Sequence, residues 1–109
     1  MDDQPSQLVP LLHEFIQLYK LMNRDKIVEI LQNELKTPVL LEMYRLTDGV
    51  LATREIAMAM QNKCSHVTVA NTWKKWALAG IVAPTEVKGR FKAMFNLEEY
   101  GIFEVKESE

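Results

Sequence analysis

The sequence predicts a mainly α-helical α+β domain, and three observations lead to this prediction. The chain has 109 residues, 48% of them hydrophobic, with only 4 glycines and 4 prolines, which is typical of a folded, helix-rich protein of one domain. Apolar side chains recur at helical spacing over most of the chain up to Gly80. Beyond Gly80 the spacing changes to short alternating segments around a glycine turn, which indicates a β-hairpin.

The N-terminal segment, residues 6–36, is predicted to be an amphipathic helical extension. Its apolar residues step by four and three in a seam of heptad type: Leu8, Leu12, Phe15, Tyr19 and Met22. Pro10 is tolerated only in a first turn, so the helix is expected to begin at residues 7–9. The stripe loses its phase at residues 23–25, which predicts either a kink or two helices. The seam has to be buried, either against its own domain or, as we expect, in a homodimer.

The next segment begins a separate domain at Thr37, because Thr37 is a suitable N-cap and Pro38 fits the first helical position. A helix over 39–46 with Leu40, Met43 and Tyr44 inward is predicted, followed by a small strand at 50–51. The predicted organisation is therefore an extension at 1–36, a domain at 37–103 and an acidic tail at 104–109. Within the last part of the domain, Asn96 and Glu99 have the spacing of a helix capping box.

Two helices with a short turn between them are predicted at the centre of this domain. The first covers residues 53–60 with Thr53 as its N-cap, and the second runs from the N-cap Ser65 to the C-terminal Gly80. In the second helix Val69, Trp73 and Trp76 form one buried stripe. The opposite face is expected to carry an amide and two cations with no acidic residue, which suits contact with base edges and phosphates in a DNA major groove.

A hairpin with a basic tip is predicted directly after these helices. Ile81 and Val82 are expected in its first strand, residues 91–95 in its second, and the sequence Lys88-Gly-Arg90 in the turn. Helix-turn-helix followed by a two-stranded hairpin is the winged helix-turn-helix arrangement.

With these elements in place, residues 37–100 resemble a known family. The segments T-R-E-I-A at 53–57, S-H-V-T-V at 65–69, A-G-I-V at 79–82 and K-G-R at 88–90 are similar to those of winged-helix transcription regulators of the arsenic-repressor and multiple-antibiotic-resistance-repressor sort. The resemblance implies double-stranded DNA as the partner. The implied and predicted DNA-binding residues are Thr53, Arg54, Ser65, His66, Val67, Thr68, Asn71, Thr72, Lys74, Lys75, Lys88, Arg90 and Lys92.

The distribution of charge favours the same partner. The formal net charge is −2, but residues 45–95 carry +5 while residues 1–44 carry −3 and residues 96–109 carry −4. The positive charge therefore coincides with the predicted helix-turn-helix and wing, and phosphate contacts depend on such a local patch.

Other function classes have little support in the sequence. The lone Cys64 excludes an intrachain disulfide and fits a cytoplasmic protein, and a redox role for it is weaker than a structural one. His13, His66 and Cys64 have no metal-ligand spacing, so neither a metal nor another cofactor is expected. No nucleophile–base pair, phosphate loop, signal peptide or membrane-spanning run is evident, so we expect neither an enzyme nor a membrane protein.

Two functional hypotheses remain at this point. The first is a sequence-specific DNA-binding transcription regulator acting as a homodimer. The second is a winged-helix protein-interaction module, because Leu78 is expected to be exposed on the face of its helix opposite Val69 and could join a partner surface. The operator sequence, any effector and the direction of regulation are not encoded in these patterns.

Overall fold

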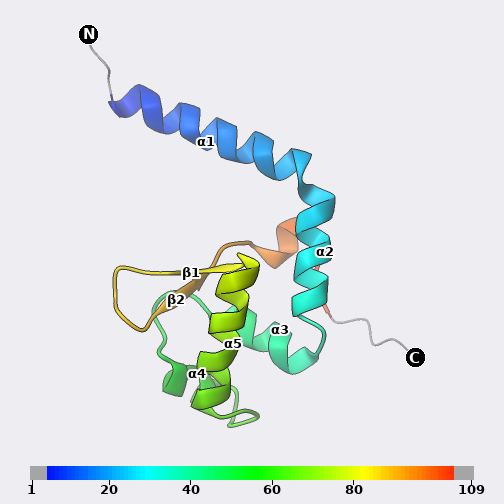
Figure 1. The fold of residues 1–109 in the computed structure, drawn as a ribbon, viewed down its shortest axis with the longest axis vertical. Helices are drawn as coiled ribbons and strands as arrows, with labels where there is room; N and C mark the ends of the chain where they lie inside the picture. Colours follow the sequence, from blue (N-terminus) through cyan, green and yellow to red (C-terminus); the bar gives the residue numbers. More distant parts are fainter. Residues whose placement is uncertain (1–4, 105–109) are drawn as a thin grey trace.

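A computed structural model describes residues 5–104, which form a mainly helical structure with one small antiparallel sheet (Figure 1). The coarse α+β prediction is confirmed. In chain order the elements are α1 (Pro5–Met22), α2 (Arg24–Glu34), α3 (Pro38–Leu46), α4 (Thr53–Ala59), α5 (His66–Ala79), β1 (Val82–Pro84), β2 (Phe91–Ala93) and the 3-10 helix η1 (Leu97–Tyr100).

Helix α5 begins and ends where its sequence predicts. The Ser65 hydroxyl accepts a hydrogen bond from the Thr68 backbone N–H at 3.1 Å, which satisfies a donor in the first turn. At the other end Gly80 takes the left-handed conformation, φ 87°, and donates its N–H back to the last turn. The predicted stripe of Val69, Trp73 and Trp76 is buried, so the rotation of α5 about its axis is fixed.

Helix α4 differs from its prediction at both ends. Thr53 is the first helical residue and Ala52 is the N-cap, because the Glu55 carboxylate accepts the Ala52 backbone N–H at 2.7 Å. The helix ends at Ala59, and the turn at residues 60–65 follows. Gln61 and Asn62 both take left-handed backbone angles, φ 58° and 60°, which turns the chain sharply into α5.

The sheet contains β1 and β2 alone among the described residues, paired antiparallel with Val82 opposite Ala93. The predicted third strand at residues 50–51 is not formed. The Asp48 carboxylate instead accepts the backbone N–H groups of both Val50 and Leu51. Because these two donors are already bonded within the turn, they are not free to pair with a neighbouring strand. A single bridge between Asp48 and Lys92 connects this turn to the sheet.

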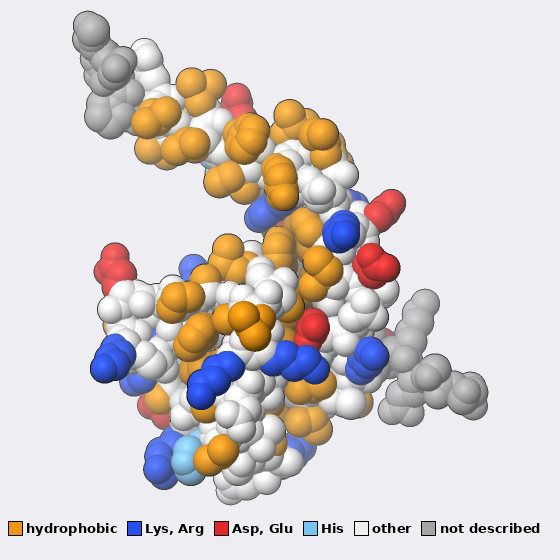
Figure 2. Space-filling view, in the orientation of Figure 1, with side chains coloured by type: hydrophobic (Ala, Val, Ile, Leu, Met, Phe, Trp, Pro, Cys, Tyr) orange, Lys and Arg blue, Asp and Glu red, His pale blue; other side chains and the backbone are white. Residues whose placement is uncertain are grey.

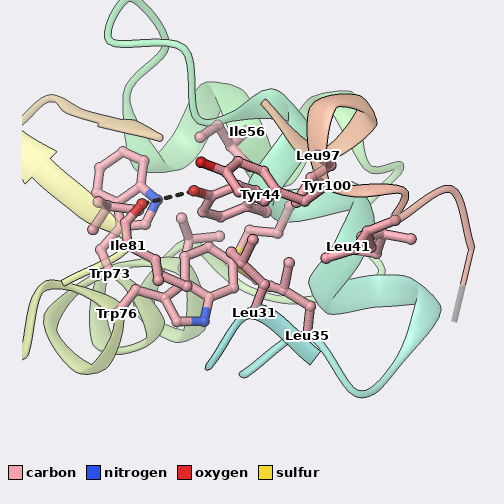
Figure 3. Packing of buried hydrophobic residues seen from close by; sticks show 14 of the residues in the cluster. Leu31, Leu35, Leu41, Tyr44, Ile56, Trp73, Trp76, Ile81, Leu97 and Tyr100 are labelled. Carbon is pink, nitrogen blue, oxygen red and sulfur yellow. Dashed lines mark hydrogen bonds between the residues drawn. The ribbon is translucent and has the colours of Figure 1, made fainter. Parts of the chain in front are cut away.

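The core lies between α2, α3, α4, α5, the sheet and η1 (Figure 3). Tyr44 is at the centre of the core. Its hydroxyl donates to the Ile81 carbonyl at 2.7 Å and accepts from the Phe95 N–H at 3.2 Å. Helix α3 is thereby bonded to the residue before β1 and to the segment after β2. Trp73 on α5 donates its indole N–H to the buried Thr47 hydroxyl at 3.1 Å. These buried polar groups are therefore satisfied and fix α5 against α3.

Helix α3 begins as predicted and buries a slightly different face. The Thr37 hydroxyl accepts the Leu40 N–H at 3.1 Å, and Pro38 is the first helical residue. Met43 and Tyr44 are buried as predicted, but Leu41 is buried while Leu40 is only half-buried. Consecutive side chains on a helix point about 100° apart, so the rotation of α3 about its axis decides whether Leu40 or Leu41 is the more deeply buried of the two.

The N-terminal segment is two helices, separated at Asn23. The side chains of Ile27 and Leu31 in α2, and that of its C-cap residue Leu35, are buried in the core. Helix α2 therefore belongs to the body of the molecule, a name used here for residues 24–104. Arg24 reinforces this by donating to the Glu99 carbonyl at 2.7 Å. The predicted 1–36 extension is thus reduced to α1, which projects from the body (Figure 1). Helix α1 starts at Pro5, two residues before the predicted start, and contains Pro10 in its interior.

The C-terminal end of the body is capped by η1. The Asn96 side chain accepts the Glu98 N–H at 2.9 Å, as predicted for a cap. Among the described residues the Glu99 carboxylate accepts no hydrogen bond from the Asn96 backbone N–H, so the predicted capping box is not completed. The Glu99 backbone N–H instead donates to the Asn96 carbonyl at 3.0 Å, as in the 3-10 helix that η1 forms. Of the predicted acidic tail only residue 104 lies within the described residues.

Candidate nucleic-acid interface

The outer face of α5 is the first part of the candidate site. Because Val69, Trp73 and Trp76 are buried, the residues on the far side of the helix point away from the body. This outer face consists of the exposed side chains Val67, Asn71, Lys74, Lys75 and Leu78. It therefore offers one amide, two cations and apolar groups, as expected from the sequence.

The first turn of α5 carries side chains that are partly committed to structure. The Ser65 hydroxyl is the N-cap, and the Thr68 hydroxyl lies 3.1 Å from it. His66 and Thr72 are half-buried, so they border the outer face rather than belong to it.

A hollow of about 470 Å³ lies between the start of α4 and the start of α5. It brings together the predicted residues Arg54, Ser65 and His66, with Met58 and Cys64 also in its wall. Burial, followed by the charge of Glu42, raises the pKa of the Cys64 thiol. The thiol therefore stays protonated at neutral pH, which weakens the redox role considered for it and favours the structural one.

Lys75 lies closer to α2 than the sequence suggests. Its ammonium is 3.9 Å from the Glu34 carboxylate oxygen Oε1, although the lysine side chain itself is largely exposed. That Glu34 oxygen is buried and accepts no hydrogen bond from the described residues. Part of the Lys75 charge is therefore used to balance Glu34, whereas Lys74 extends from the next position around the helix.

The β1–β2 hairpin supplies the second part of the candidate site. Lys88 and Lys92 are exposed, with Lys88 in the turn and Lys92 on β2. Arg90 is half-buried at the base of the turn instead of at its tip, and its Nε donates to the Val50 carbonyl at 2.9 Å. It therefore connects the hairpin to the turn at residues 48–51.

Asp48 stabilises that turn. The hydrogen bond from the Val50 backbone N–H is the main reason that the pKa of the Asp48 carboxyl lies below its usual value. An ionised Asp48 therefore fixes the position of Val50, whose carbonyl accepts the hydrogen bond from Arg90.

Among the described residues every Lys and Arg except Lys20 lies on the body, whereas α1 is mainly apolar. Figure 2 shows Lys and Arg side chains over α5 and near the end of the hairpin, whereas hydrophobic side chains cover the visible side of α1. The same view also shows acidic side chains on the body, including one near the end of the hairpin, where Glu86 is exposed in the turn, so the charge of the body surface is mixed.

The five residues predicted for the dimer interface are all exposed in the single chain. Leu8, Leu12, Phe15, Tyr19 and Met22 make no part of the core. The alternative of packing against their own domain is therefore not realised. Five further apolar residues of α1, outside the predicted seam, are also exposed: Val9, Leu11, Ile16, Leu18 and Leu21. A full helical wheel of the segment would have found them: Val9, Leu11, Ile16 and Leu18 flank the seam, whereas Leu21 lies on the opposite, mainly polar side of α1.

Leu78 is 92% exposed, the highest value among the exposed large hydrophobic side chains of the described residues. On the outer face of α5 it lies one turn from Lys74 and two turns from Asn71. The expectation that Leu78 points to solvent is confirmed.

Searches for related proteins found no matching family model, curated protein or solved structure. Within residues 5–104 no three His, Cys, Asp or Glu side chains are grouped as metal ligands. The helices of this same range include none with the length and apolarity to cross a membrane.

Proposed function

We propose that the protein is a sequence-specific double-stranded DNA-binding regulator with a winged helix-turn-helix fold, active as a homodimer. In this proposal α4 and α5 are the helix-turn-helix, α5 is the recognition helix and the β1–β2 hairpin is the wing. The observation that carries it is the outer face of α5, which is held outward by three buried side chains and presents Asn71 beside Lys74 and Lys75 without an acidic neighbour on that face.

The chemistry of this face suits a DNA major groove. The paired donor and acceptor of an asparagine match the N6 and N7 edge of adenine, and the methyl groups of Val67 can contact a thymine methyl. Lysine side chains at the margins neutralise phosphates and release counterions. A recognition helix docks with its N-terminal residues on the bases, and Val67 and Asn71 lie in that half of α5.

The hollow between α4 and α5 supports the same docking. Arg54 at the start of α4 and His66 at the start of α5 border it together. In a helix-turn-helix the first helix crosses the DNA backbone, so Arg54 is placed to contact a phosphate while α5 enters the groove. Lys88 and Lys92 extend the cationic surface along the wing.

The proposal is tested by fluorescence anisotropy with labelled duplex DNA over a range of salt concentrations. The logarithm of the affinity should fall linearly with the logarithm of salt concentration, with a slope that reflects several phosphate contacts. As a control, the Lys20→Ala variant removes a cation on α1, outside the proposed DNA interface. It should leave the slope of affinity against salt concentration unchanged. Binding that is absent at low salt would contradict the proposal.

A second candidate function follows from Leu78. Its nearly complete exposure on the outer face of α5 suits contact with a protein partner, and here the winged helix would act as an interaction module without reading DNA. The surrounding Lys74 and Lys75 favour DNA, because protein interfaces are depleted in lysine. If the protein does not bind duplex DNA even at low salt, the interaction module becomes the better account.

A further inference from the structure

Helix α1 exposes far more apolar surface than the heptad seam alone. Nine side chains form one continuous sector, each 48% to 75% exposed: Leu8, Val9, Leu11, Leu12, Phe15, Ile16, Leu18, Tyr19 and Met22. At 100° per residue this sector covers about half of the helix circumference. A helix this apolar is stable in water only when its sector is covered.

The sector is too wide for two helices. When the seam is placed at heptad positions a and d, Val9 and Ile16 fall at e, and Leu11 and Leu18 fall at g. Two-stranded coiled coils bury a and d and place charged residues at e and g. Here both flanks are aliphatic, so each α1 requires a neighbour on either side of its seam, as in a four-helix bundle.

The amount of surface supports the same arrangement. With ordinary side-chain areas, the exposed fractions of the nine residues amount to on the order of 1,000 Å² per chain, compared with ~800 Å² per partner in a standard interface. A seam-only pair would bury the five seam side chains and leave the four flanking ones in water.

Other copies of α1 are the surface that fits. The exposed large apolar side chains of the body are spread over several elements, with no more than two on any one of them: Val50, Met58, Val67, Leu78, Val87, Met94 and Phe103. No element of residues 24–104 presents a stripe as long as α1. A membrane surface fits less well, because the polar stripe of α1 carries one Lys and one Glu rather than a cationic face.

We infer that four copies of this chain assemble through a four-helix bundle of α1 helices, as a pair of the proposed dimers. The seam residues join two chains, and the e and g residues join the two dimers. The bodies remain outside the bundle, because α1 projects away from them (Figure 1). The inference rests on the dimer of the proposed function but not on DNA binding.

The test is sedimentation velocity on the full chain without DNA at micromolar concentration. The wild type should sediment with four chain masses. Ile16→Gln combined with Leu18→Gln should sediment with two chain masses and keep its helical circular dichroism, since neither side chain contributes to the core. The matched control, His13→Gln combined with Glu14→Gln, makes the same change on the polar stripe and should remain a tetramer.

Each other outcome overturns the inference. A wild type of two chain masses, or a flank variant that remains a tetramer, shows that e and g do not join dimers, while the proposed dimer stands. A wild-type monomer removes both assemblies, and flotation of that monomer with anionic phospholipid vesicles assigns α1 to a membrane surface. A flank variant that unfolds shows that α1 serves the fold instead of assembly. None of these results bears on duplex binding by the body, which the anisotropy experiment measures separately.

Discussion

Asn71 is the residue expected to read a base, because it lies on the side of α5 opposite the buried Val69 and Trp73. Asn71→Ala should lose about 1–3 kcal/mol at one base-pair position and relax the preference there. The measurement is a selection of bound sequences from random duplex DNA, repeated with the variant. An unchanged preference would show that α5 docks in a different rotation or faces a protein.

Lys74 and Lys75 provide the matched comparison for Asn71. Replacing either with alanine should weaken binding to all duplexes alike and leave the base preference intact, since lysines contact phosphates. The loss should be smaller for Lys75→Ala, because its ammonium is already 3.9 Å from the Glu34 carboxylate. Anisotropy titrations on one duplex would measure both losses, and a larger loss for Lys75→Ala would contradict this interpretation of the Glu34 contact.

Tyr44 gives the body a specific pH dependence. Burial raises the pKa of its hydroxyl to about 12, from an ordinary value of 10.0. The folded protein therefore holds this proton more tightly than the unfolded chain, and the stabilisation is fully present below pH 10.0. It is lost as the pH rises from there to about 12, by on the order of 2 kcal/mol.

Urea unfolding at a series of alkaline pH values would measure this loss, with Tyr44→Phe as the comparison. The variant should lack the Tyr44 part of the pH dependence. It should also be about 1–3 kcal/mol less stable at neutral pH, because the Phe95 N–H loses its partner and the Ile81 carbonyl keeps only the Met94 N–H. Equal pH dependence in the two proteins would show that Tyr44 is not the titrating group.

At the scale of elements, the wing is expected to contribute phosphate contacts without choosing a sequence. Lys88→Ala combined with Lys92→Ala should flatten the salt slope by roughly one to two units, because each phosphate contact contributes about 0.9 to it. Arg90 is not a suitable substitute for either lysine, since its Nε holds the Val50 carbonyl and its removal would also loosen the wing. An unchanged slope would remove the wing from the DNA interface.

The sequence predicted those elements whose ends are determined locally. Ser65 and Gly80 bound α5, and Thr37 with Pro38 begins α3, because capping depends on residues within one turn. The strand expected at residues 50–51 is absent for a reason that is also local: the Asp48 carboxylate accepts the two backbone N–H groups that a strand would use, from residues two and three positions along the chain.

The candidate site was predictable to a similar extent. The outward direction of Asn71 and Lys74 followed from the helical period, which needs only the buried stripe. The contact of Lys75 with Glu34 and that of Arg90 with Val50 could not be predicted, because each joins residues about 40 positions apart. Assignment of α2 to the body also depended on the three-dimensional packing of Ile27 and Leu31.

At the scale of the whole molecule, α1 and the body have separable roles. Phe15→Glu combined with Tyr19→Glu places charges in the seam and should reduce the assembly to monomers. The melting temperature of the body should change little, because α1 contributes nothing to its core. Light scattering gives the mass and circular dichroism the melting curve. Monomers that also lose their fold would show that the body depends on α1.

The central claim is that α5 reads a DNA sequence as part of a symmetric dimer. Selection from random duplex DNA with the full wild-type chain tests it most directly. The account predicts enrichment of one motif with two inverted half-sites, because a two-fold dimer presents two copies of Asn71 and its neighbours. Recovery of sequences without a shared motif, at salt concentrations where the protein still binds duplex, would contradict it.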